Sequence, residues 1–125
     1  MSNALAFRFA ALFGVAAVAL GAFGAHALKE VLSRNDTAAI WQTAVLYHFI
    51  HTLMLVILAT RAPLRLGPWW SFAVGIIIFS GSLYLLAITN LRWLGAITPL
   101  GGASFLVGWV WLMVCPGPKT PSSTS

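Results

Sequence analysis

Charged side chains are scarce in this sequence, and acidic ones are the scarcest. Of its 125 residues, 7% are charged, with seven Lys and Arg against two Asp and Glu, and 60% are hydrophobic. A soluble domain carries about 25% charged residues, so this chain could not cover its apolar surface in water. The scarcity excludes a soluble protein and predicts a membrane protein, with the lipid bilayer as its first partner.

The formal net charge of +5 does not indicate nucleic-acid binding. A nucleic-acid binder gathers its basic residues on one soluble face. Here the basic residues fall between long apolar runs, as residues that anchor membrane loops do. We therefore expect no nucleic-acid partner.

The sequence has a single cysteine and no carboxylate inside its apolar runs. Cys115 is the only cysteine, which rules out an internal disulfide. No Asp or Glu lies inside an apolar run, although cation-coupled carriers usually rely on a buried carboxylate. Ser80, Ser82 and Ser104 have no acid nearby and no catalytic motif around them. We therefore expect no enzymatic chemistry, no cofactor and no metal.

Four long apolar runs make up most of the chain. They predict membrane-spanning helices over residues 5–28, 37–60, 69–88 and 94–114. Each run is close to the length that crosses a ~30 Å hydrocarbon core. The predicted fold class is all-α: an antiparallel bundle of four transmembrane helices that forms one domain over residues 1–115. Residues 116–125 are rich in Pro, Ser and Thr and predict a disordered tail.

The connections between these runs are short. Residues 29–35 predict a polar loop, with Asp36 as the N-cap of the second helix. Residues 89–93 predict a tight turn, so the last two helices should form an antiparallel hairpin. Pro99 either kinks the fourth helix or stands at the start of its regular part, with Thr98 as the cap.

A cleavable signal peptide is the competing interpretation of the first run. Ala25, His26 and Ala27 have the small-x-small shape of a cleavage site. However, the apolar run is longer than the 7–15 residues usual for the core of a signal peptide. The positively charged segment that should precede this core has only one basic residue, Arg8. A first transmembrane helix is therefore the favoured interpretation.

Small residues recur at helical spacing in the first and last runs. Glycines and alanines alternate at spacings of four and three from Ala10 to Gly24, and a shorter stripe follows Gly101. Such stripes allow close backbone contact between membrane helices. The predicted helix-packing positions are Gly14, Gly21, Gly24, Gly101 and Gly108.

Four spans put both termini on one side of the membrane. That side would hold four bases and no acid: Arg8, Arg61, Arg65 and Lys119. The other side would hold three bases and both acids: Lys29, Arg34, Arg92, Glu30 and Asp36. Because bases are enriched in cytoplasmic segments, this bias predicts cytoplasmic termini. The expected location is a multi-pass protein of the bacterial inner or plasma membrane.

Three histidines are the titratable groups to consider inside the spans. His48 and His51 lie three residues apart on the second predicted helix, so they project from neighbouring positions. From the helical rise, His26 and His48 differ in depth by about 7 Å, within reach of two side chains or one bridging water. With Gln42 nearby, we predict a polar pocket between the first two helices, formed by His26, Gln42, His48 and His51.

This pocket allows three interpretations. The histidines could fix the register of the helices by hydrogen bonds, which is the favoured one because polar side chains commonly join membrane helices. They could instead form a proton or small-solute path, since histidine titrates near neutral pH. A metal or haem site is the least supported, because His26 and its partners differ in depth and no carboxylate or cysteine completes a ligand set.

Several motifs together resemble a known family. In order they are GAFGAHALK at residues 21–29, WQTAV with the following His48 and His51, SGSLYLLAI at 80–88, GAITPLGG at 95–102, and Gly108-Trp109. The chain resembles the domain-of-unknown-function 423 family, whose eukaryotic relative is transmembrane protein 256. The resemblance covers roughly residues 5 to 114. It implies a small four-helix integral membrane protein and no known reaction.

These observations predict a structural or accessory component of a membrane assembly. Its partner would be a second membrane protein or another copy of this chain. The alternative is a small channel or carrier that uses the histidine pocket.

Overall fold

Four apolar helices long enough to cross a membrane make up the computed structural model, which describes residues 1–117. The first two spans are α1 (Asn3–Ala25) and α3 (Ala38–Ala59). The third, Leu66–Thr89, joins α4 (Leu66–Gly75), a π-helical segment η1 (Ile76–Ser80) and α5 (Gly81–Thr89). The fourth, Arg92–Val114, joins a 3₁₀ segment η2 (Arg92–Ala96) and α6 (Thr98–Val114). The all-α class and the four spans are thus confirmed.

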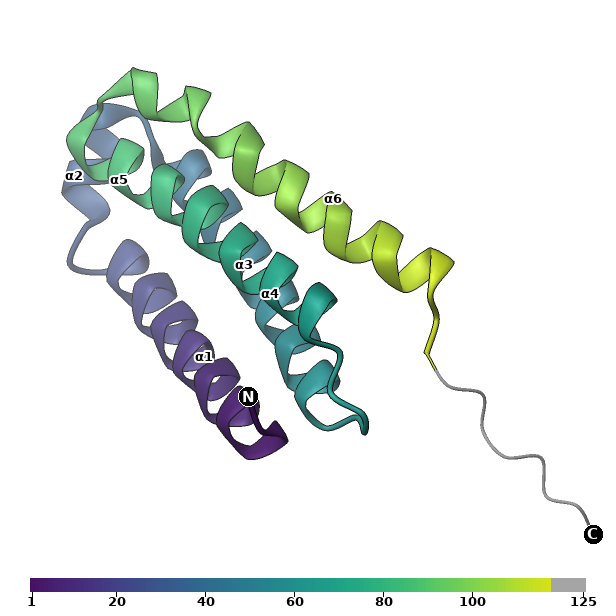
Figure 1. Cartoon of the computed structure of the whole chain (residues 1–125). Coiled ribbons are helices and arrows are strands. Elements are labelled where there is room, and N and C mark those ends of the chain that lie inside the picture. Colours follow the sequence, from purple (N-terminus) through teal and green to yellow (C-terminus); the bar gives the residue numbers. More distant parts are fainter. Residues whose placement is uncertain (118–125) are drawn as a thin grey trace, which may run out of the picture.

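The spans are antiparallel neighbours in chain order. In Figure 1, α1 and α6 lie on opposite sides of the layer formed by α3 and the third span. Accordingly, α1 packs mainly on α3, and α6 packs on α4 and η1. The chain begins α1 and ends α6 at the same end of the molecule, whereas α2 (Lys29–Asn35) lies at the opposite end (Figure 1).

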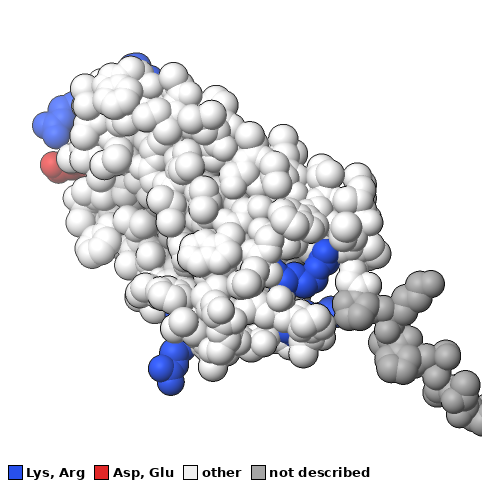
Figure 2. Space-filling view, viewed as in Figure 1, with Lys and Arg blue, Asp and Glu red and all other residues white. Residues whose placement is uncertain are grey.

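The described surface is apolar over its middle, as expected of helices that face lipid. Large side chains are exposed on each span, among them Leu12, Leu53, Ile77 and Met113. Figure 2 shows Lys and Arg at two ends of the molecule, separated by a broad band without charge. Because charges are costly in the hydrocarbon core, this band is the part that lipid tails surround.

Two buried clusters hold the spans together. The larger joins α1, α3, α4, η1 and α6 around Trp69, Phe72 and Phe105. The smaller lies at the α2 end and joins α2, α3 and α5 around Trp41 and Tyr84.

The structure corrects the predicted connection before the second span. Residues 29–35 form the helix α2 rather than a polar loop, and Asp36 ends that helix instead of starting the next one. Asp36 has φ 53° and ψ 45°, a left-handed conformation that Asp tolerates better than most residues. Thr37 precedes α3, and its buried hydroxyl donates to the carbonyl oxygen of Ala87 at 2.7 Å.

The helix ends also differ from the predicted ones by a few residues. α1 ends at Ala25 rather than residue 28, and the third span begins at Leu66 rather than residue 69. Pro99 stands at the start of α6, where its missing N–H needs no partner. The predicted disordered tail lies, from residue 118 onward, outside the described residues.

Candidate functional site

The four residues of the predicted pocket do not share one cavity. His26 follows the last residue of α1 and is exposed. His48 and His51 are buried on α3, with exposed fractions of 3% and 4%, and they contact different partners. Gln42 lines a cavity beside α1 that none of the three histidines lines. The prediction that His26 and His48 occupy one space was therefore wrong.

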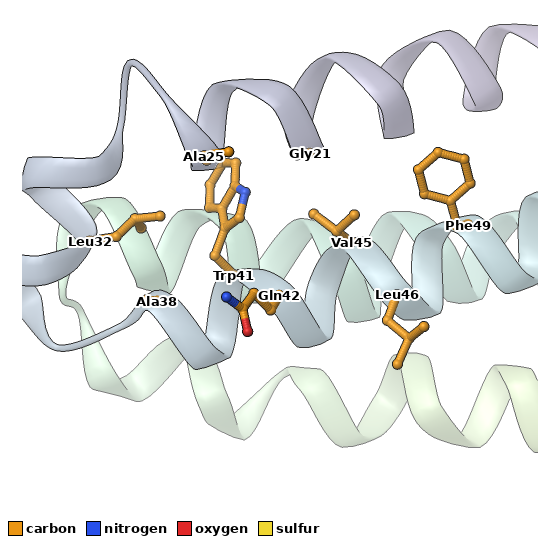
Figure 3. A pocket seen from close by; sticks show the side chains of 10 residues that line it. Gly21, Ala25, Leu32, Ala38, Trp41, Gln42, Val45, Leu46 and Phe49 are labelled. Carbon is orange, nitrogen blue, oxygen red and sulfur yellow. The ribbon is translucent and has the colours of Figure 1, made fainter.

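Trp41, and not His48, packs against the end of α1 near His26. Its indole ring reaches from α3 towards α1 (Figure 3), and its N–H donates to the carbonyl oxygen of Leu20 at 3.0 Å. Gly24 lies against this ring, and a Cβ there would overlap the indole atoms. His48 lies far from this position, because its ring packs against Phe13, twelve residues or about 18 Å before Ala25 along α1.

His51 connects α3 to α6. The indole N–H of Trp109 donates to His51 Nε2 at 3.1 Å, and Nδ1 lies 2.7 Å from the carbonyl oxygen of Tyr47. Because an indole N–H can only donate, Nε2 must accept, so Nδ1 carries the proton and donates to Tyr47. The ring also stacks on Phe105, with centroids 3.7 Å apart and planes 10° apart. His51 is thus neutral, with both nitrogens bonded.

His48 connects α3 to α5 and faces α1. Its Nδ1 lies 2.9 Å from the hydroxyl oxygen of Tyr84, and its ring meets the edge of Phe13 at a centroid distance of 6.3 Å. Its Nε2 has no hydrogen-bond partner within residues 1–117, and neither has the hydroxyl of Thr52 one turn further along. Thr52 packs towards α1, where its methyl group lies 3.7 Å from the position of a Cβ added at Gly14.

Serine hydroxyls in and just after the π-helical segment bond to neighbouring spans: Ser80 is the last residue of η1, and Ser82 lies in α5. Ser80 donates to the carbonyl oxygen of Ala44 on α3 at 2.7 Å, rather than to a carbonyl one turn back as its place in a helix suggests. Ser82 donates to the Phe79 carbonyl oxygen and lies 2.6 Å from the Thr98 hydroxyl. Segments of this kind often mark functional positions, and here the segment joins three spans.

The five glycines predicted at helix contacts lie at two kinds of position. A Cβ at Gly24, Gly101 or Gly108 would overlap a neighbour: the Trp41 indole, the Phe79 backbone or the Phe72 ring. A Cβ at Gly14 or Gly21 would make ordinary contacts, at 3.7 and 3.5 Å. The need for glycine is therefore greatest at the α2 end of α1 and along α6.

Comparison with known proteins gives the family. The model of a family described as "Protein of unknown function (DUF423)" matches residues 20–102. The chain belongs to the DUF423 family. It is 42% identical over 119 residues to the UPF0382 inner membrane protein YgdD of Escherichia coli K12, covering 91% of this chain and 90% of that protein.

Relatives from other bacteria match the DUF423 chain similarly. Identity is 41% over 110 residues with the UPF0382 membrane protein YwdK of Bacillus subtilis, covering 83% of this chain and 89% of the relative. A UPF0382 membrane protein of Staphylococcus epidermidis is 43% identical over 109 residues, with 83% and 88% covered. No solved structure matches the chain significantly. These names identify membrane proteins and give no enzymatic activity. Together with the four apolar helices, they show that this chain is a multi-pass membrane protein.

Sequence reasoning missed the partners of the buried histidines in this DUF423 chain. No partner was predicted from the sequence for Tyr84, Trp109 or Ser80, yet they bond to His48, His51 and Ala44, respectively. A signal was present, because all three lie in the motifs that carry the family resemblance. Which motif residues meet across helices, however, depends on how the helices are rotated.

Proposed function

We propose that the chain is a structural or accessory component of a membrane assembly, without enzymatic chemistry, in the bacterial inner or plasma membrane. The observation that carries this proposal is the state of His51. Both of its nitrogens are bonded inside the bundle, to Trp109 and to Tyr47. A transport path needs polar groups that are free to exchange partners, whereas His51 serves as a link between helices.

Other polar groups in the spans support the same role. Ser80, Ser82 and Thr98 are engaged in hydrogen bonds between or within helices. The helix contacts at Gly14, Gly21, Gly24, Gly101 and Gly108 add close packing to these bonds. The result is a rigid scaffold with a wide apolar surface, which suits contact with another membrane protein or a further copy of the chain.

Affinity purification tests this proposal. The tagged chain would be extracted in a mild detergent and its co-purifying proteins identified by mass spectrometry, with an unrelated four-span protein at equal expression as the control. We expect a near-stoichiometric membrane protein, or a defined oligomer of the chain, absent from the control. Tagging that partner should recover this chain in turn. A monomer with only the control's background proteins would contradict an accessory role.

A small channel or carrier is the second candidate. The observation in its favour is the pair of buried, unpartnered polar atoms on one side of α3, His48 Nε2 and Thr52 Oγ1. A water or small polar solute that accepts or donates hydrogen bonds there would satisfy both. Flux measurements in proteoliposomes, described in the Discussion, distinguish this candidate from an accessory role.

A further inference from the structure

A continuous groove runs along the outside of α1, α2 and α3. The cavity beside Gln42 has a volume of about 450 Å³ and is mainly apolar, and Val45, Leu46 and Phe49 line it further along α3 from α2 (Figure 3). A second cavity, of about 410 Å³, adjoins it. The two share five lining residues: Gly24, Ala25, Leu32, Ala38 and Gln42. They are therefore two parts of one groove.

The groove is polar at one end and apolar at the other. Lys29, Ser33 and Asp36 line the part next to α2. From Ala38 to Phe49 the groove follows α3 for eleven residues, or about 17 Å. One leaflet of hydrocarbon is about half of the ~30 Å core. The apolar part is thus as long as one leaflet is thick, and the polar part lies at the level of the head groups.

The floor of the groove is fixed. Leu32 and Trp41 are 3% and 2% exposed, and the Trp41 indole is held by its hydrogen bond to Leu20. On the α1 side, Gly24 adds no side chain to the groove, and a Cβ there would overlap the indole. A ligand would therefore meet a formed surface rather than mobile side chains.

The charges at the polar end select among amphiphiles. Lys29 and Asp36 line the same cavity, so a cation and an anion face one head group. The two acids of the chain, Glu30 and Asp36, both lie at the α2 end. A phosphate would contact Lys29, and a protonated amine would contact Asp36. An uncharged alcohol head would leave Asp36 without a cation, and a quaternary amine offers it no N–H donor.

We propose that this groove binds one phospholipid whose head group carries a phosphate and a primary ammonium group. The phosphate lies against Lys29, the ammonium group against Asp36, and one acyl chain along Val45, Leu46 and Phe49. This goes beyond the accessory role proposed above, because it names a specific ligand and is independent of any protein partner.

Native mass spectrometry of the full chain in detergent tests the lipid preference. The probes are phosphatidylethanolamine, phosphatidylglycerol and phosphatidylcholine with identical acyl chains. We expect a single bound phosphatidylethanolamine at concentrations where the other two lipids are not retained. Equal retention of all three lipids would mean only a general lipid shell and would overturn the proposal.

Matched variants test the two ends of the groove. Asp36→Asn, which also tolerates the left-handed backbone, should remove the preference for phosphatidylethanolamine over phosphatidylcholine, while Glu30→Gln outside the cavity should keep it. Lys29→Gln should weaken the binding of all three phospholipids by about fivefold, which corresponds to the largest free energy usual for one exposed ion pair.

The apolar part is tested by filling it. Ala38→Trp should abolish retention of the lipid, whereas Ala39→Trp should not, because both alanines are exposed on α3 but only Ala38 lines the groove. Lipid retention by folded Ala38→Trp equal to that of the wild-type chain would overturn the proposal. If Ala38→Trp does not fold, the Asp36→Asn result decides alone. An unchanged preference of Asp36→Asn for phosphatidylethanolamine over phosphatidylcholine would then overturn the proposal.

Discussion

Single polar side chains act as links between helices in this membrane protein. In the hydrocarbon core no water competes for the indole N–H of Trp109, the hydroxyl of Tyr84 or the hydroxyl of Ser80. Each bonds to a group on another helix: His51, His48 or the Ala44 carbonyl. Each bond therefore specifies which faces of two helices meet.

The link between His51 and Trp109 should be measurable as a coupling energy. We expect Trp109→Phe to destabilise the wild-type chain by about 1 kcal/mol, because His51 Nε2 loses its donor while remaining buried. In a His51→Phe background, which keeps a ring against Phe105, the same change should cost much less. Unfolding in detergent micelles would give a coupling of about 0.6–1.7 kcal/mol, between the average and the maximum found for membrane hydrogen bonds.

Additivity of the two substitutions would contradict this link. If the double variant were destabilised by the sum of the single effects, within about 0.5 kcal/mol, the hydrogen bond would contribute nothing specific.

The sequence was sufficient to place His48 and His51 inside a span, but not to find their partners. Burial follows from position in an apolar run, whereas a partner depends on helix rotation and on side chains distant in sequence. His26 was misplaced relative to His48 because the sequence does not give the register between α1 and α3, which puts His48 beside Phe13. α1 ends at Ala25, and the chain turns into α2, so His26 leaves the helical face assumed for it.

At the scale of elements, α6 meets the backbone of η1 at Gly101. A Cβ at Gly101 would overlap the backbone nitrogen of Phe79 and lie 2.7 Å from its Cα. A backbone cannot rotate away as a side chain can. Gly101 therefore allows the contact that joins the third and fourth spans, next to the π-helical segment.

Adjacent glycines provide a matched test of this contact. Gly101→Ala should destabilise the fold by about 1–3 kcal/mol, as overpacking does. Gly102→Ala should be neutral within about 0.5 kcal/mol, because its Cβ would lie 3.8 Å from the Phe79 ring. Thermal unfolding of the purified variants in detergent makes the comparison. Equal midpoints for the two variants would show that α6 does not depend on a close approach at Gly101.

The existence of the four spans was predictable, since length and hydropathy alone require them. α2 was not, because its seven residues LysGluValLeuSerArgAsn are mostly polar and resemble a loop. It is held by tertiary contacts that no local pattern reveals. Leu32 is buried in the smaller cluster, and the Asn35 side chain donates to the carbonyl oxygens of Ala87 and Ile88.

At the scale of the whole molecule, α1 and α6 form the outer edges. In the most apolar part of each span, 17% of the residues of the first span and 22% of those of the fourth are buried. The corresponding shares are 39% and 44% in the two middle spans. In the membrane, these outer helices are the ones most available to lipid or to a partner. Their exposed faces include Val15 on α1 and Met113 on α6.

We expect both termini of the chain to lie in the cytoplasm. Reporter fusions at the C-terminus and after Asn35, at the end of α2, should indicate opposite sides of the membrane. The physical reason is the base-rich, acid-free composition of the segments on the terminal side. A C-terminal fusion active outside the cytoplasm would contradict this orientation. Both fusions on one side would indicate an even number of spans after Asn35, instead of the three that the structure has.

Proton flux in proteoliposomes separates a structural role of the buried histidines from a transport role. After a pH step between about 5.5 and 7.5, where histidine changes charge, liposomes holding the wild-type chain should acidify no faster than protein-free liposomes. His48→Gln and His51→Gln should give the same rate as the wild-type chain. Flux above the protein-free rate that is lost in His48→Gln but retained in His51→Gln would contradict an accessory role and assign transport to the His48–Thr52 side of α3.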